Sequence, residues 1–328
     1  MPDWGQLLGE FDQERRKGIP TFLDTVRRRY LDALFGYTDR NIIAYYSGFL
    51  SKPGIQLLGV NDEDMTGFMT AVHGLDKSKG LDLFLHTPGG SIAATESLVN
   101  YLHLMFGNDI RVIVPQIAMS AGTMIACSSR EILMGKQSSL GPIDPQIRDI
   151  PAQGVLNEFQ RALTEIKGDP DAINVWRWII SQYHPTFLGQ CRQAMDWTEK
   201  FVGNQLRDVM FEGDPAAEEK AQRIVSGLSD TDTHKSHERH IPIAKCLELG
   251  MNVTPLEKDE KLQDLVLTIH HCYSHALMNT PTFKIIENHK GAAFIKTQQA
   301  PTPPVQLIQQ LQQPRPIPPQ APLGNRIS

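Results

Sequence analysis

Two short loops carry residue types that are suited to hydrolytic chemistry. They are Pro88-Gly89-Gly90 and Met119-Ser120-Ala121-Gly122. A glycine pair lets backbone N–H groups approach a ligand, because no Cβ blocks the way. A serine at the entry of a small-residue helix lies at the positive end of the helix dipole. Together the loops could supply a nucleophile and two backbone donors for an oxyanion, although a serine in this position is also a common helix N-cap.

Each loop follows a short apolar segment of the kind found in buried strands. Residues 81–86 precede the glycine pair, residues 110–115 precede the serine loop, and residues 131–134 form a third such segment. Helical patterns follow the two loops, at 91–106 and 120–129. This alternation predicts an α/β fold with a mostly parallel sheet. Because the carboxyl ends of neighbouring parallel strands share one edge of the sheet, we expect the two loops to lie together there.

The rest of the chain is predicted to be largely helical. Further helical patterns lie at 5–35 with a break at Pro20, at 62–72, across 155–212, within 213–232, at 242–251 with Gly250 as C′ residue, and at 262–278, and one more strand is predicted at 41–46. The sequence from Gln298 onward is rich in proline and glutamine, which predicts disorder. We therefore divide the chain into an N-terminal helical extension at 1–37, a catalytic domain at 38–298 and a disordered tail at 299–328.

The segments LFLHTPGGSIAATESLVNYL and IRVIVPQIAMSAGTMIACSSREILMGKQSSLGPIDPQI resemble the Clp-protease and signal-peptide-peptidase superfamily. Within it, the greatest similarity is to the family called serine dehydrogenase proteinase. The resemblance covers residues 38–255. It implies a Clp/crotonase-like fold of stacked strand–strand–helix units, with helical additions at both ends. It also implies a serine peptidase in which Ser120 is the nucleophile and the N–H groups of Gly90 and Ala121 form the oxyanion hole.

The resemblance leaves the general base open. Where Clp proteases carry a histidine this chain has Asp144, and an aspartate is a poor base at neutral pH because its ordinary pKa is ~3.9. We expect Asp144 to orient a loop or a partner group. Signal peptide peptidases use a lysine farther downstream, and Lys167 has that spacing. His237 with Glu238 lies in a segment resembling the one that carries the catalytic acid of Clp proteases, and imidazole titrates near neutral pH. We predict Lys167 as the base and His237 as its alternative.

Composition excludes several other classes of protein. The 328 residues are 41% hydrophobic and 21% charged, with a net charge of −5. This composition is typical of a globular protein, and it offers no basic surplus for nucleic acid. The basic run Arg27-Arg28-Arg29 is predicted to be a solvated helix face. No stretch has the length and apolarity of a signal peptide or transmembrane helix, and the four cysteines form no CxxC pair, so we expect a cytoplasmic protein without disulfides.

The expected partners follow from the resemblance. We expect a peptide or unfolded protein as substrate and a homo-oligomeric assembly. Neither a cofactor nor a metal is expected: there is no GxGxxG fingerprint or HExxH motif, and the histidine groups 234/237/240 and 271/275 follow helical spacing. A non-proteolytic protein of the same fold, either an acyl-binding enzyme or an interaction scaffold, is the alternative function. The serine of the second loop favours the peptidase, and the missing histidine favours the alternative.

Overall fold

The structure is a computed structural model that describes residues 4–19, 21–147, 150–229 and 239–298. One compact unit extends to Thr297. His237, Glu238 and the tail at 299–328 lie outside the described residues. The predicted domain boundaries stay predictions.

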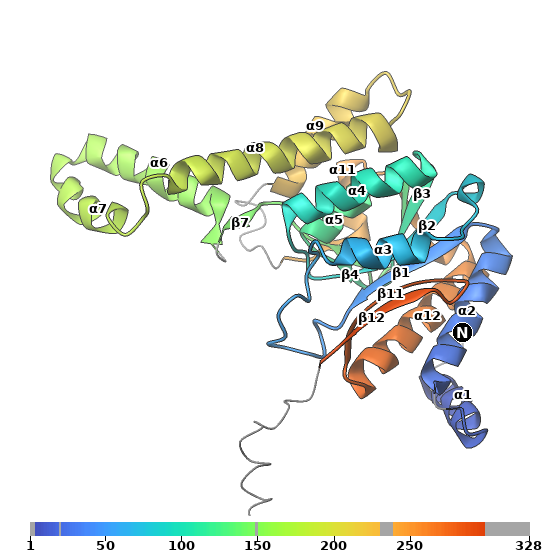
Figure 1. Ribbon diagram of the computed structural model, residues 1–328. Helices are drawn as coiled ribbons and strands as arrows, with labels where there is room; N and C mark the ends of the chain where they lie inside the picture. Colours follow the sequence, from blue (N-terminus) through green and yellow to red (C-terminus); the bar gives the residue numbers. More distant parts are fainter. Residues whose placement is uncertain (1–3, 20, 148–149, 230–238, 299–328) are drawn as a thin grey trace, which may run out of the picture. The chain divides into compact units, whose positions relative to one another are not determined.

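A seven-stranded sheet forms the centre of the compact unit (Figure 1). Its order is β10-β5-β3-β2-β1-β11-β12. The first five strands pair in parallel, whereas β11 pairs antiparallel with β1 and β12 pairs antiparallel with β11. The strands are β1 Asn41–Ser47, β2 Leu81–His86, β3 Ile110–Val114, β5 Glu131–Met134, β10 Val253–Pro255, β11 Thr282–Asn288 and β12 Ala293–Thr297. The predicted α/β fold with a mostly parallel sheet is confirmed.

Two small sheets add to this framework. In the first, β4 (Ile117–Ala118) pairs with β6 (Ser139–Leu140), which pairs with β9 (Ile241–Pro242). In the second, β7 (Gln146–Ile147) pairs with β8 (Ile150–Pro151). The first sheet links the chain before Ser120 to the segment that follows residue 238.

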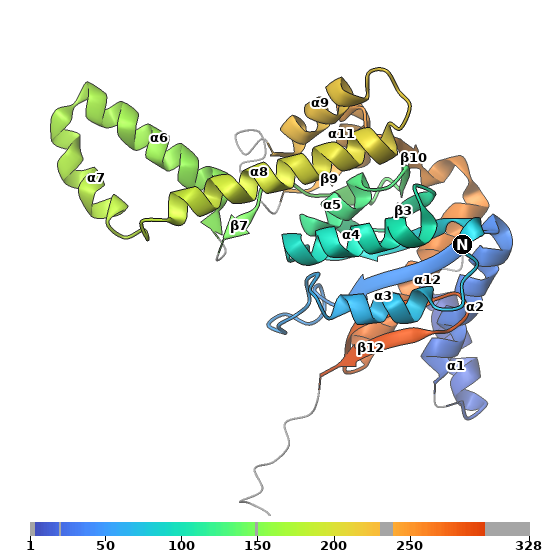
Figure 2. The same cartoon turned by 45° about the horizontal axis from the view of Figure 1, so that its top comes forward.

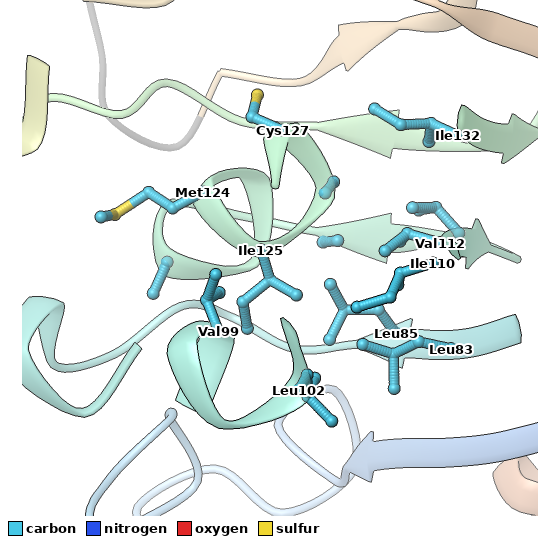
Figure 3. Packing of buried hydrophobic residues seen from close by; sticks show 14 of the residues in the cluster. Leu83, Leu85, Val99, Leu102, Ile110, Val112, Met124, Ile125, Cys127 and Ile132 are labelled. Carbon is cyan, nitrogen blue, oxygen red and sulfur yellow. The ribbon is translucent and has the colours of Figure 1, made fainter. Parts of the chain in front are cut away.

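Helices cover both faces of the large sheet (Figure 2). On one face lie α3 (Asp64–Val72), α4 (Ile92–Phe106) and α5 (Ala121–Cys127), and on the other lie α2 (Phe22–Thr38) and α12 (Glu260–Asn279), with α1 (Trp4–Arg16) packed against the last two. Because strand side chains alternate, Leu83 and Leu85 join the α4–α5 side while Phe84 joins the α12 side. Figure 3 shows residues of α4 and α5 packed over β2, β3 and β5. This packing fixes α5, and therefore its first turn, against the sheet.

Five more α-helices follow β8 in the described residues. They are α6 Ala152–Gly168, α7 Ile173–Ile180, α8 Phe187–Gln205, α9 Ala217–Ser229 and α11 Ile243–Leu249. The short helical turns are η1 Lys77–Lys79, which precedes β2, and η2 Pro170–Ala172, η3 Leu206–Met210 and η4 Leu256–Lys258, which follow β8. Buried residues of α6 and of the first half of α8 form their own cluster, whereas Phe201 and Val202 of α8 join the main core. We call residues 152–195 the arm. None of the described helices is both long and apolar enough to cross a membrane.

The prediction that the arginine run is a solvated helix face is wrong for Arg27. Its side chain is fully buried, and its guanidinium binds the carboxylate of Glu287, which is also fully buried. Tyr273 donates a 2.7 Å hydrogen bond to the same carboxylate. A buried charge needs such partners, and here they come from β11 and α12. Since β11 was not predicted, there was no reason to expect a buried partner for this arginine.

Candidate active site

Ser120 stands in a strained turn between β4 and α5. Its φ and ψ are 50° and −112°, values of the first central residue of a type II′ turn, where glycine is the usual residue. The turn is closed by a 2.7 Å hydrogen bond from the Gly122 N–H to the Met119 carbonyl. A capping serine would have extended backbone and bond to the first turn of the helix, but the Ser120 side chain makes no capping bond. The geometry therefore favours a nucleophile over an N-cap.

The glycine pair packs directly against this turn. Gly89 has φ 113°, and a Cβ built on it would lie 2.7 Å from the Ser120 Cβ. Gly90 has φ 150°, and a Cβ there would overlap the backbone of Val60. Val60 clamps the loop from the other side, since its N–H donates to the Gly89 carbonyl at 2.7 Å and its carbonyl accepts from the Ser91 N–H at 2.9 Å. Both positions thus require glycine for close approach.

Two further bonds hold the loops to each other. The Thr87 N–H donates to the Ile117 carbonyl at 3.2 Å, and the Met119 N–H donates to the Thr87 carbonyl at 3.1 Å. The predicted meeting of the two loops is confirmed. The N–H groups of Gly90 and Ala121 donate to no other residue in the described part of the chain. They are available to a ligand beside the partly exposed Ser120.

A buried polar cluster lies behind the glycine loop. The Lys284 ammonium donates to the Gly59 carbonyl at 2.7 Å and to both carboxylate oxygens of Asp64 at 2.9 Å. Tyr45 donates to Asp64 at 2.8 Å, and the Asn61 N–H donates to it at 3.1 Å. Burial lowers the pKa of Lys284, and the Asp64 carboxylate opposes that shift. The cluster fixes the backbone on both sides of Val60, and through Val60 it positions the glycine loop.

The other predicted site residues are distributed differently. Asp144 is buried and engaged in interactions of its own. Lys167 is exposed in the last turn of α6. That end of α6 leads into α7, at the side of the arm remote from α5 in both views (Figures 1 and 2). Ser120, Gly90 and Ala121 are thus brought together, Lys167 of the same chain is not, and His237 and Glu238 lie outside the described residues.

The sequence did not lead us to predict that His240 lies near the strand that leads to Ser120. Its Nδ1 lies 2.6 Å from the hydroxyl of Ser139 on β6. In the small sheet Leu140 pairs with both Ala118 and Ile241, so the chain at 240–242 lies near the strand that leads to Ser120. Its only signal in the sequence was the short extended pair Ile241-Pro242.

The close packing of Gly89 against Ser120 provides a test of the glycine loop. Gly89→Ala is expected to lower kcat/KM about 100-fold, because the new Cβ must displace Ser120 from its turn. The control is Gly54→Ala, which has a positive φ of 84° but no heavy atom near its Cβ position. It carries the same type of backbone strain without the contact. Steady-state hydrolysis and thermal melting of both variants make the comparison, and equal activities would contradict the assignment.

The sequence of this chain is similar to those of several known proteins. An uncharacterised protein of Methanocaldococcus jannaschii is 27% identical over 224 residues, which span 68% of this chain and 69% of that protein. A second uncharacterised protein of the same organism is 30% identical over 205 residues, which span 62% of each chain. The proteolytic subunit of the ATP-dependent Clp protease of Streptococcus sanguinis is 32% identical over 87 residues, 25% of this chain and 44% of the subunit.

No solved structure matches the chain. A family model described as "ClpP-like SDH-type serine proteinase" matches residues 44–289, a span that runs from within β1 past the end of β11 and includes both loops. The matched span is well over half of the chain. The chain therefore belongs to the ClpP-like SDH-type serine proteinase family.

Proposed function

We propose that this protein is a serine peptidase in which Ser120 is the nucleophile and the N–H groups of Gly90 and Ala121 are the oxyanion donors. The observation that carries the proposal is the strained conformation of Ser120, which leaves its hydroxyl free of a capping bond. Family membership supports the reaction class. The substrate is a peptide or an unfolded protein segment.

The proposed reaction follows from the placement of these groups. The Ser120 Oγ attacks the carbonyl carbon of a peptide bond while a general base takes the hydroxyl proton. The carbonyl oxygen becomes an oxyanion, which the N–H groups of Gly90 and Ala121 stabilise. The proton passes to the leaving amine, and an acyl-enzyme ester remains on Ser120. Water then hydrolyses the ester with the same base.

Lys167 remains the proposed base, and its exposed position on the arm suits a base that serves Ser120 of a second copy. Lys167→Met is expected to lower kcat about 1,000-fold with little change in KM, because the variant keeps the aliphatic stem and removes the base. Lys200→Met is the matched control, since Lys200 is an exposed lysine of α8 in the same region of the chain. A lysine base also predicts a pH–rate profile that rises above the histidine range of about 6–7.

His237 is the alternative base, and the pairing of β9 with β6 supports it, because this segment enters the small sheet near Ser120. In that case activity would rise near pH 6–7 and survive Lys167→Met. Mixing inactive Ser120→Ala protein with inactive Lys167→Met protein separates the two assignments. Restored hydrolysis supports a lysine given by a second copy, whereas an active Lys167→Met variant excludes it.

A fluorophosphonate probe tests the proposed nucleophile directly. We expect stoichiometric labelling of the native chain and recovery of the label on the peptide that contains Ser120. Ser120→Ala should abolish labelling, whereas Ser181→Ala, at an exposed serine whose hydroxyl bonds to Trp178, should leave it unchanged. Absence of labelling in a folded protein at several pH values would favour the non-proteolytic alternative.

A further inference from the structure

Two buried histidines lie together at the carboxyl end of β2. His86 is the last residue of that strand and is 4% exposed, and His270 of α12 is 9% exposed. Their rings meet edge to face, with the ring centres 5.4 Å apart. The contact joins the end of β2 to α12. Neither residue has a part in the proposed reaction, so their burial at this edge of the sheet calls for another explanation.

Uncharged groups surround the pair. The rings of Tyr46 and Phe49 lie 5.4 and 4.9 Å from that of His86, and the Tyr46 hydroxyl is hydrogen-bonded to Nδ1 of His270 at 3.3 Å. The ring of His271 lies 6.1 Å from that of His270. Both members of the pair line a cavity of about 510 Å³, and its described lining residues include no acidic side chain, lysine or arginine. A positive charge on either ring would therefore lack a counter-charge.

The nitrogens of His86 make protonation of this ring especially unfavourable. The ring hydrogen-bonds to the backbone of Ile117, whereas its Nδ1 is buried and has no partner. In the neutral ring Nδ1 carries only a lone pair when the other nitrogen holds the proton. Protonation would place an N–H group at Nδ1, where neither a protein acceptor nor water reaches it. The charged ring could meet its hydrogen-bonding needs only by leaving this position.

The titration of the surrounding groups agrees with this geometry. Burial lowers the pKa of His86 to about 4 and that of His270 to about 3, and in His270 the neighbouring histidines add to the shift. Burial also lowers the pKa of His271, raises that of the Cys272 thiol to about 12 and raises that of the Tyr46 hydroxyl well above its ordinary value. The whole group is thus uncharged at physiological pH.

His86 is connected to both catalytic loops. It directly precedes Thr87, where the glycine loop begins. The Thr87 N–H donates to the Ile117 carbonyl at 3.2 Å, and the Met119 N–H donates to the Thr87 carbonyl at 3.1 Å, one residue before Ser120. Movement of the His86 ring would therefore disturb the glycine loop and the strand that leads to Ser120 at the same time.

We propose that His86 is a positioning residue for the two catalytic loops, and that the support it shares with His270 is lost when these rings are protonated. While both rings are neutral, their contact holds the end of β2 against α12 and keeps Thr87 and Ile117 in place. In acid the charged rings leave their buried positions and the two loops open. The opening does not require Ser120 to be a nucleophile, whereas its effect on hydrolysis rests on the proposed function.

The size of the effect follows from the difference in pKa between the two states. A histidine in an opened loop has a pKa of about 6.5, so it binds a proton more readily there than in the folded site. The supported state is therefore fully favoured above about pH 6.5 and weakens as the pH falls toward about 4. Between pH 7 and pH 5, protonation of His86 alone is expected to shift the equilibrium about 20-fold toward the opened loops.

Hydrogen exchange of the full chain carrying Ser120→Ala measures this opening without catalysis. After correction for the intrinsic exchange rate, amides at 87–91 and 117–123 are expected to lose at least about tenfold of their protection between pH 7 and pH 5. Adding His86→Gln and His270→Asn removes both titrating rings but keeps a donor for Ile117 and an acceptor for Tyr46. The loss should then fall below about threefold.

The control for this experiment is His73→Gln, at an exposed histidine that follows α3, and it should lose as much protection as the chain with all its histidines. The proposal is overturned if that chain keeps its protection at pH 5, or if the double histidine variant loses as much. Should the double variant not fold, NMR titration of the imidazoles decides, because a pKa of either ring near 6.5 would overturn the proposal as well.

The effect on hydrolysis is measured separately, in chains that retain Ser120. Dividing kcat/KM of the native chain by that of the double histidine variant removes the titration of the general base, which both chains share. This ratio is expected to fall at least about threefold between pH 7 and pH 5. A constant ratio would overturn the link between the pair and hydrolysis. Loss of protection in a chain without any hydrolysis would instead overturn the proposed function and leave the positioning of the loops by His86 standing.

Discussion

Ser120→Ala is expected to lower peptide hydrolysis by at least about 10⁴-fold while the protein stays folded. The large effect is expected because the proposed nucleophile acts together with a base and the proposed oxyanion donors, so its loss would remove the covalent pathway. The fold should tolerate the change, since the Ser120 side chain makes no capping bond. Hydrolysis of an unfolded protein substrate, measured beside circular dichroism, gives both results. Full residual turnover would exclude Ser120 as the nucleophile.

Ser120→Gly is the informative control for this assignment. It should be as inactive as the alanine variant, yet more stable than it, because glycine adopts φ 50° and ψ −112° without the strain that a Cβ causes. Strain of this kind amounts to about 1–3 kcal/mol, and part of it is offset by the greater freedom of glycine in the unfolded chain. A higher melting temperature of the glycine variant would show that the native chain maintains the strained turn at the expense of stability.

The sequence predicted the strands and loops of the site because their signals are local. Residues 81–86 and 131–134 are mostly apolar and contain neither glycine nor proline, and the structure has strands with the same bounds. The glycine pair and the serine loop follow strands that neighbour each other in both sequence and sheet, so their meeting follows from parallel topology alone. The strain at Ser120 was not predictable, since a serine before a helix is usually a cap.

The antiparallel strands β11 and β12 were not predicted, and charge explains why for β11. Only Phe283, Ile285 and Ile286 are apolar in the segment at 282–288, and Lys284 and Glu287 carry charges, which are rarely buried. Each is nevertheless fully buried because a partner distant in sequence neutralises it, Asp64 for Lys284 and Arg27 for Glu287. The same pairing explains why Arg27 was misassigned to solvent. Ion pairs between residues so far apart in sequence produce no periodic pattern, so the sequence alone could not predict them.

Lys284→Met is expected to destabilise the protein by about 3–5 kcal/mol, the second large effect predicted here. Both side chains of the Lys284–Asp64 pair are buried, so removing the ammonium leaves the carboxylate of Asp64 without its counter-charge. Tyr45 and Asn61 would still donate to that carboxylate, but neither carries a charge. Urea unfolding at neutral pH measures the loss. We also expect a lower kcat, because Lys284 binds the Gly59 carbonyl beside the clamp on the glycine loop.

Two variants separate the buried charge from other effects of this substitution. Lys296→Met on β12 removes an ion pair with Glu63, whose side chain is 60% exposed, and should change stability little, because solvent screens the pair from that side. The double variant Lys284→Met/Asp64→Asn removes both charges but keeps an acceptor for Tyr45 and Asn61, so most of the lost stability should return. If Lys284→Met costs no more than Lys296→Met, the buried pair does not stabilise the fold. If the double variant recovers stability but not kcat, the hydrogen bond from Lys284 to the Gly59 carbonyl is needed to hold the Gly59–Val60 backbone and, through it, the proposed oxyanion donor of Gly90.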